Sequence, residues 1–276
     1  MYTLTRRACR ISLAAAAVAA LALPMACSRQ RDPVTAEEKA ARGDQLLRQM
    51  SDTLKNAKAF SFTVDESHER VRRNGAKEPY TLTRELVVRR PDRLYNRTRG
   101  SDSRDLELSY DGKQITIVGN RLKIYATVPA PATLDETLDL ISERYDLRVA
   151  AADFLYSVPY DSFAASDAKG GWTKKVKLGD RDCDEVSYSM KAVDVTLSVS
   201  SEAPVLPCQA RIAYKEEPGA PVSTLTFSRW NLNAAPADDQ FAAKIPQGYE
   251  AIPVVERIPK PELKADPAKA MHASQK

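Results

Sequence analysis

The sequence predicts an α+β protein built on one large curved antiparallel sheet, a half-open β-barrel of about 10–11 strands with helices over its concave face. Three observations lead to this prediction. Apolar residues alternate with polar ones over many short runs, turn dipeptides such as Asn74-Gly75 and Asp111-Gly112 separate the runs, and few segments have helical spacing. An open sheet of that size curls, and its apolar face needs a cover.

Residues 1–26 are predicted to be a secretory signal. Three arginines precede a thirteen-residue apolar stretch that is too short for a comfortable membrane span. Ala26 then precedes Cys27, an order that resembles a bacterial lipoprotein signal. The resemblance implies that Cys27 is lipidated and that Ser28 directs the protein to the outer membrane; cleavage without lipid is the alternative. Residues 27–34 form the tether of this anchor.

The charge of the chain carries little information about its partners. The 276 residues include 41 Lys and Arg against 37 Asp and Glu, a net charge of +4. Removal of residues 1–26 takes away three arginines and no acid, which leaves +1. Bulk charge therefore gives no reason to expect a nucleic-acid partner.

The first element after the tether is a helix, and it opens a single domain over residues 35–252. Thr35 and Glu38 fit a capping box. An apolar stripe at helical spacing follows and consists of Leu46, Leu47, Met50, Leu54 and Ala57.

Six alternating runs between Phe60 and Ile124 then predict six strands. Thr133 and Glu136 begin a helical insertion, and a shorter helix is expected over residues 150–156, with Pro159 ending it. Five further strands are expected between Trp172 and Trp230. Residues 253–276 are rich in Pro and Lys and are predicted to be a disordered tail.

Two cysteines remain once the signal and the candidate lipid site are set aside. Cys183 and Cys208 lie in an exported chain and lack C-x-x-C spacing, so they predict a structural disulfide. In a simple meander they begin alternate strands, roughly 9–10 Å apart, which is too far for a bridge. We therefore expect Cys208 in the connector 204–207, folded over the intervening strand.

No motif for catalysis, a metal or a cofactor stands out. Residues 180–191 place acids at alternate positions, but Glu185 and Lys191 occupy the positions where a calcium loop needs Gly and Glu. The only histidine in the predicted domain, His68, lies among charged residues without a nucleophile motif. The sequence predicts a protein that is not an enzyme.

Several short segments resemble a known family. Arg90-Pro91-Asp92-Arg93 between two strand runs, Tyr110-Asp111-Gly112 and Ala213-Tyr214-Lys215 are similar to segments of domain of unknown function 2092, a family of predicted periplasmic proteins. These segments also resemble the LolA/LolB-like lipoprotein-carrier superfamily, which contains this family and the regulator RseB. The resemblance implies a periplasmic half-barrel that binds a lipid or the acyl chain of a lipoprotein.

The apolar side chains of the sheet and of the covering helices are the candidate ligand site. Strand parity does not distinguish a packed core from a cavity, and the resemblance favours a cavity. The candidate lining residues are Phe60, Phe62, Leu86, Val88, Leu108, Tyr110, Ile115, Ile117, Leu122, Ile124, Leu138 and Phe154.

A basic stretch suggests a second function. Residues 70–104 contain eleven basic and four acidic side chains, a local net charge of +7. Arg89, Arg90 and Arg93 are the candidate surface for an anionic headgroup or for an acidic envelope protein. The alternative hypothesis is therefore an RseB-like interaction module; a solvated strand face is the plain structural interpretation.

Overall fold

The computed structural model describes residues 31–145, 147, 149, 151–164 and 168–256. The predicted signal, Cys27, the first half of the tether and most of the predicted tail lie outside the described residues. The elements belong to one compact unit that begins at Pro33. No described helix is long and apolar enough to cross a membrane.

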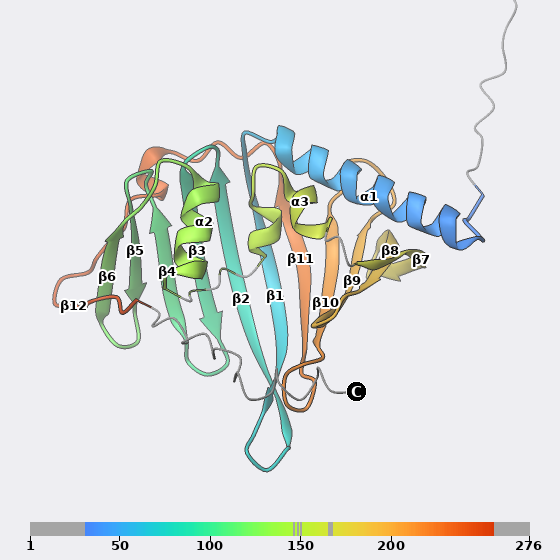
Figure 1. Ribbon diagram of the computed structural model, residues 1–276. Coiled ribbons are helices and arrows are strands. Elements are labelled where there is room, and N and C mark those ends of the chain that lie inside the picture. The colour runs from blue at the N-terminus through green and yellow to red at the C-terminus, as the bar shows by residue number, and fades with distance from the viewer. Residues whose placement is uncertain (1–30, 146, 148, 150, 165–167, 257–276) are drawn as a thin grey trace, which may run out of the picture. The chain divides into compact units, whose positions relative to one another are not determined.

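The described residues form one twelve-stranded sheet in the order β12-β6-β5-β4-β3-β2-β1-β11-β10-β9-β8-β7 (Figure 1). The strands are β1 (Ala59–Val71), β2 (Lys77–Arg89), β3 (Arg93–Gly100), β4 (Asp105–Tyr110), β5 (Gln114–Gly119), β6 (Ile124–Pro129), β7 (Lys169–Leu178), β8 (Arg181–Ser189), β9 (Val193–Ser200), β10 (Pro207–Tyr214), β11 (Val222–Asn231) and β12 (Glu250–Ala251). The sheet is curved and does not close on itself, so the predicted half-open barrel is confirmed.

The order of the strands explains where the helices lie. β1–β6 form one meander and β7–β11 a second one, and the two meet where β1 pairs with β11. The outer strands β6 and β7 are thus consecutive in the chain but lie at opposite ends of the sheet. The residues that join them, 130–168, must cross the whole sheet, and we call them the helical crossover. They contain α2 (Leu134–Glu143), η1 (Ala152–Phe154) and α3 (Pro159–Phe163), which lie over one face of the sheet, the covered face (Figure 1).

A second crossover runs over the opposite face. Residues 232–249 leave β11, include η2 (Asp238–Gln240), and bring β12 to the far edge, where it pairs parallel with β6. The fully buried Phe241 belongs to this crossover. The strand β12 was not predicted, because a two-residue strand has no period that a sequence can display.

The N-terminal helix α1 (Ala36–Asn56) forms as predicted. The Thr35 side chain accepts from the Glu38 N–H and the Glu38 carboxylate accepts from the Thr35 N–H, which completes the capping box. The helix packs on β7 and α3. Gly43 makes this approach possible, because a Cβ there would lie 2.8 Å from the Cα of Gly171 on β7.

Aromatic rings fill the centre of the covered face. Phe60, Phe62 and Phe227 are buried, and the ring of Phe62 stacks on that of Trp230 with centroids 4.2 Å apart. Phe154 of η1 meets Phe227 edge-on at 5.0 Å. The strongest apolar contacts of the sheet therefore lie where β1 and β11 join its two meanders.

Two predicted details of the helical crossover and the strands are wrong. Pro159 begins α3 rather than ending a helix, since proline is favoured in the first helical turn, where its missing N–H costs nothing. Leu122 was expected on the apolar face of a strand, but it lies in the turn before β6 and is 66% exposed.

The cysteine pair also differs from the expected arrangement. Cys208 lies in β10, not in the connector, at the point where the register of β10 on β9 slips between Pro207 and Gln209. Cys183 and Cys208 are both buried and are free thiols in this structure. Burial and a hydrogen bond with Cys183 raise the pKa of Cys208 to about 12. The bulge thus brings together two thiols from alternate strands, which a regular sheet keeps apart.

Candidate functional site: a cavity under the helical crossover

The segment 151–163 lies over the covered face and is held by three different elements. Arg90, at the end of β2, donates to the carbonyl oxygens of Leu155 at 2.9 Å and of Tyr156 at 2.7 Å. Desolvation lowers the pKa of Arg90, since the guanidinium lies beneath the helical crossover. Arg90 was predicted to belong to a surface for partners, and this role is wrong: its side chain anchors the crossover.

The helix α2 holds the middle of the same segment. The Tyr156 hydroxyl donates to Asp139 at 2.7 Å, and the Ser157 N–H donates to Asp135 at 2.9 Å. Desolvation and the hydrogen bond to Asp139 raise the pKa of Tyr156 well above its usual range. These contacts turn the carboxylates of α2 toward the chain that follows it.

The helix α1 holds the end of the segment. The Tyr160 N–H donates to the Ser51 hydroxyl at 3.0 Å, and the Tyr160 hydroxyl donates to Asp44. Arg48 donates to the Tyr160 hydroxyl at 2.7 Å and lies over its ring at 4.0 Å. Hydrogen bonds from Arg48 and Tyr160 lower the pKa of Asp44. Hydrogen bonds from Arg90, α2 and α1 therefore fix the position of the segment 151–163 over the sheet.

A cavity of about 260 Å³ remains between this segment and strands β8–β11. The helical crossover contributes Ala151, Asp153, Phe154, Ser162 and Phe163 to its wall. The sheet contributes Tyr188, Met190, Val193, Val195, Leu197, Ala210, Ile212, Tyr214 and Leu225. We call it the crossover cavity. Its walls are mostly apolar and its volume lies near the lower end of ligand pockets.

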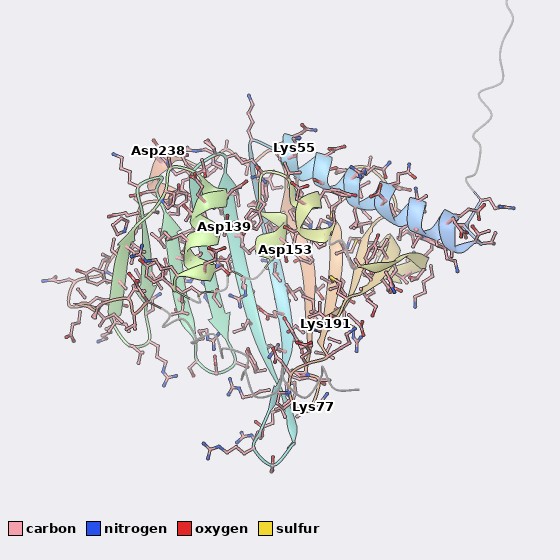
Figure 2. The ribbon with its side chains drawn as sticks, viewed as in Figure 1. Lys55, Lys77, Asp139, Asp153, Lys191 and Asp238 are labelled. Atoms are coloured by element: carbon pink, nitrogen blue, oxygen red, sulfur yellow. The ribbon has the colours of Figure 1, made fainter. Side chains whose placement is uncertain are left out.

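Among the described residues that line the cavity, Asp153 is the only carboxylate. Figure 2 places it on the helical elements over the sheet, as it does Asp139 of α2. The Asp153 side chain is exposed to solvent on one side, and partial desolvation by the cavity wall raises the pKa of its carboxyl. Within the described part of the chain, no side chain forms an ion pair or hydrogen bond with it.

Most of the predicted ligand-binding residues lie elsewhere. Seven are buried in the core, namely Phe60, Phe62, Leu86, Val88, Tyr110, Ile115 and Leu138. Leu108 and Ile117 pack against that core, and of the twelve only Phe154 lines the crossover cavity. The alternation of apolar residues correctly identified the covered face of the sheet, but it did not locate the cavity on that face. Most of the predicted residues lie in the part of the face that packs as a core beneath α2. The cavity residues Val195 and Ile212 show the same alternation in the second meander, and this signal was available in the sequence.

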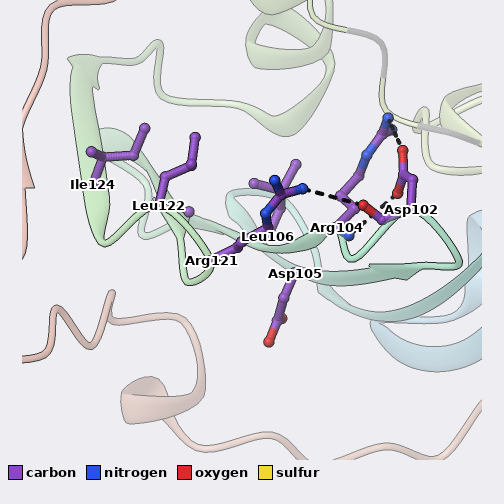
Figure 3. Close-up of a pocket in the computed structure, with 8 residues that line it drawn as sticks. Asp102, Arg104, Asp105, Leu106, Arg121, Leu122 and Ile124 are labelled. Atoms are coloured by element: carbon purple, nitrogen blue, oxygen red, sulfur yellow. Dashed lines mark hydrogen bonds and ion pairs between the residues drawn. The ribbon is translucent and has the colours of Figure 1, made fainter.

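Leu122 and Ile124 line a different, open pocket at the end of strands β4–β6 (Figure 3). Its volume is about 340 Å³, and Leu106 is the third large apolar residue in it. Arg104 pairs with Asp102 at 3.2 Å, and Arg121 donates to the Asp102 carbonyl at 3.3 Å. Arg104 and Asp102 of this pocket thus pair with each other, whereas Asp105 pairs with Arg97 outside it.

The three predicted surface arginines do not share one face. Arg89 is the last residue of β2 and Arg90 lies in the turn that follows it, and their side chains contact different crossovers. Arg89 donates to the Pro236 carbonyl at 3.2 Å and pairs with Asp238 of the second crossover. Arg93 pairs with Asp92 at 2.6 Å. Arg89 therefore anchors the second crossover and Arg90 the helical crossover. The prediction that these arginines form one common surface is wrong.

Most basic residues of the stretch are ion-paired, some with acids inside residues 70–104 and others with acids outside it. Arg84 pairs with Glu66 at 3.0 Å and Arg97 with Asp105 at 3.4 Å. The ion-paired basic residues are Arg70, Arg72, Lys77, Arg84, Arg89, Arg93, Arg97, Arg99 and Arg104. Four of these nine pair with acids outside residues 70–104, namely Glu66, Glu69, Asp105 and Asp238, and a local count along the chain missed those acids. The charge that motivated an interaction surface is therefore much reduced.

Other chemistry finds little support among the described residues. His68 binds the Ser223 hydroxyl through Nδ1 and contacts the ring of Tyr80. No group of three His, Cys, Asp or Glu residues in the described part of the chain is arranged to hold a metal ion.

Comparisons with known proteins identify a family. A family model described as "predicted periplasmic protein (DUF2092)" matches residues 43–255. A search of curated proteins finds no match.

Solved structures with similar chains have low identity. They include an uncharacterized conserved protein from Thermus thermophilus, with 9% identity, TM-score 0.44 and coverage of 76% of this chain and 97% of the other. A LolA superfamily protein from Nitrosomonas europaea has 14% identity, TM-score 0.34 and coverage of 74% and 99%. The lipoprotein LppX of Mycobacterium tuberculosis has 13% identity, TM-score 0.44 and coverage of 70% and 96%. With TM-scores this low, we rest no functional argument on them.

Proposed function

Because the chain belongs to the DUF2092 family of predicted periplasmic proteins, we propose that it is a non-catalytic protein of the cell envelope that holds a hydrophobic ligand in the crossover cavity. The ligand class is a lipid or the acyl chain of a lipoprotein. The observation that carries the proposal is the apolar lining of a cavity of about 260 Å³ under a firmly held segment. Each methylene buried there contributes about 0.8 kcal/mol.

The rigidity of the walls supports binding over simple packing. Arg90, Tyr156 and Tyr160 attach the covering segment to β2, α2 and α1. A wall fixed by charged and polar contacts does not collapse into the space beneath it without losing them. A preformed cavity also spares the ligand the cost of ordering its site.

Lipid extraction is the direct test. The full chain with Cys27→Ser, which removes the candidate anchor, is exported to a bacterial periplasm, purified without detergent, extracted with organic solvent and analysed by mass spectrometry. We expect a lipid at near-stoichiometric amount, and displacement of the dye N-phenyl-1-naphthylamine by added lipid. A folded protein that retains no lipid and binds no dye contradicts the proposal.

The proposal also includes a lipid anchor and a location at the outer membrane. Lipidation at Cys27 tethers the domain to the outer membrane, with residues 27–34 as the spacer. The domain then meets lipids or acylated proteins at the membrane surface. An unlipidated periplasmic form, from cleavage without lipid, uses the same cavity.

We also propose that Cys183 and Cys208 form a disulfide in the exported protein. Both thiols are buried and in contact, and the periplasm is oxidising. Thiol titration of the denatured, unreduced protein, with Cys9→Ser and Cys27→Ser in the same chain, should find no free thiol, and two after reduction. Reduction should lower the free energy of unfolding by about 3 kcal/mol. The Cys183→Ser variant, with one thiol in either condition, is the control; two free thiols before reduction contradict the proposal.

A further inference from the structure

Asp153 places a carboxylate in a mostly apolar wall, whose other described polar side chains are Ser162, Tyr188 and Tyr214. The fold gives Asp153 no structural task. It does not anchor the helical crossover, because Arg90, Tyr156, Ser157 and Tyr160 do so. Among the described residues no lysine or arginine pairs with it, in contrast to the ion-paired acids elsewhere on the sheet.

The chemistry of this position points to a cation. An ionised carboxylate among apolar groups has lost part of its hydration, and a positive charge brought beside it restores that stabilisation. Phe154 and Phe163 flank the same wall, so an apolar body fits below the charge. An anionic head group, such as the carboxylate of a fatty acid, is instead repelled by the negative charge of Asp153.

We propose that the crossover cavity selects amphiphiles with a cationic amino group, which Asp153 binds while the apolar part occupies the cavity. This inference rests on the proposed function and specifies its ligand class. It also distinguishes this cavity from one that accepts any acyl chain.

Matched twelve-carbon probes test the inference on the full chain with Cys27→Ser. Binding of dodecylamine, dodecanol and sodium dodecanoate is measured by calorimetry near pH 7 below their aggregation concentrations. We expect dodecylamine to bind at least tenfold more tightly than dodecanol, and dodecanoate to bind more weakly than dodecanol. A hydrogen bond between two charged groups in such surroundings accounts for that ratio.

Two variants separate Asp153 from the general charge of the surface. Asp153→Asn should reduce the affinity for dodecylamine about tenfold and leave that for dodecanol unchanged. Asp161→Asn, on α3 and outside the cavity lining, should change neither. Equal binding of amine and alcohol by the unsubstituted protein, or an amine preference that survives Asp153→Asn, overturns the inference while the proposed function stands. If none of the three probes binds, the proposed function fails together with it.

Discussion

The Ala210→Phe substitution should abolish binding of a hydrophobic ligand. Ala210 lies on β10, is 5% exposed and forms part of the cavity floor. A benzyl group there extends into the space of about 260 Å³ that we assign to the ligand. We expect the affinity for N-phenyl-1-naphthylamine to fall at least tenfold, with the free energy of unfolding changed by less than about 3 kcal/mol, the usual limit for overpacking.

Ala213→Phe is the matched control for this prediction. Ala213 lies three residues further along the same strand and points to the opposite face, because strand residues alternate. This variant should bind the dye as the unsubstituted protein does. Val195→Trp, from the adjacent strand β9, fills the same cavity by a second route. Unchanged dye binding in both cavity variants would show that the dye occupies another site.

Removal of the Phe62 ring should cost the protein about 3–5 kcal/mol of stability. Phe62 is 2% exposed, stacks on Trp230 at 4.2 Å and lies 6.1 Å from Phe227. It is the side chain through which β1 and β11, and thus the two meanders, share one core. Because domains of this kind are stable by about 5–15 kcal/mol, Phe62→Ala should lose a large part of the total.

Urea denaturation followed by tryptophan fluorescence and by circular dichroism measures this loss. Leu122→Ala is the control, since Leu122 is 66% exposed and should change the free energy of unfolding by less than about 0.5 kcal/mol. If Phe62→Ala lowers the free energy of unfolding by less than about 1 kcal/mol, the contact between β1 and β11 through Phe62 does not have the importance that we assign to it.

The local elements and their kind could be predicted from the sequence. Thr35 and Glu38 began a helix because their capping contacts lie within one turn. The alternation of apolar residues identified the strands of both meanders, since each strand has one face toward the covering helices. The curved open sheet followed, because strands in that number cannot pack flat.

Which residues meet across the sheet depends on contacts between distant parts of the chain. Arg89 and Arg90 are neighbours in the chain, yet they anchor crossovers on opposite faces. The charge of the basic stretch is partly offset by Glu66, Asp105 and Asp238, which lie outside it in the chain and beside it in space. Local counting does not reveal such pairs.

The location of the cavity was decided in the same way. Phe62 and Ile212 belong to runs with the same period, but Phe62 lies in the filled part of the covered face and Ile212 in the hollow part. The difference depends on where the helical crossover passes over the sheet and on how Arg90, Tyr156 and Tyr160 hold it there. Periodicity determines which face of a strand is buried; what fills the space beyond that face depends on contacts between residues far apart in the chain.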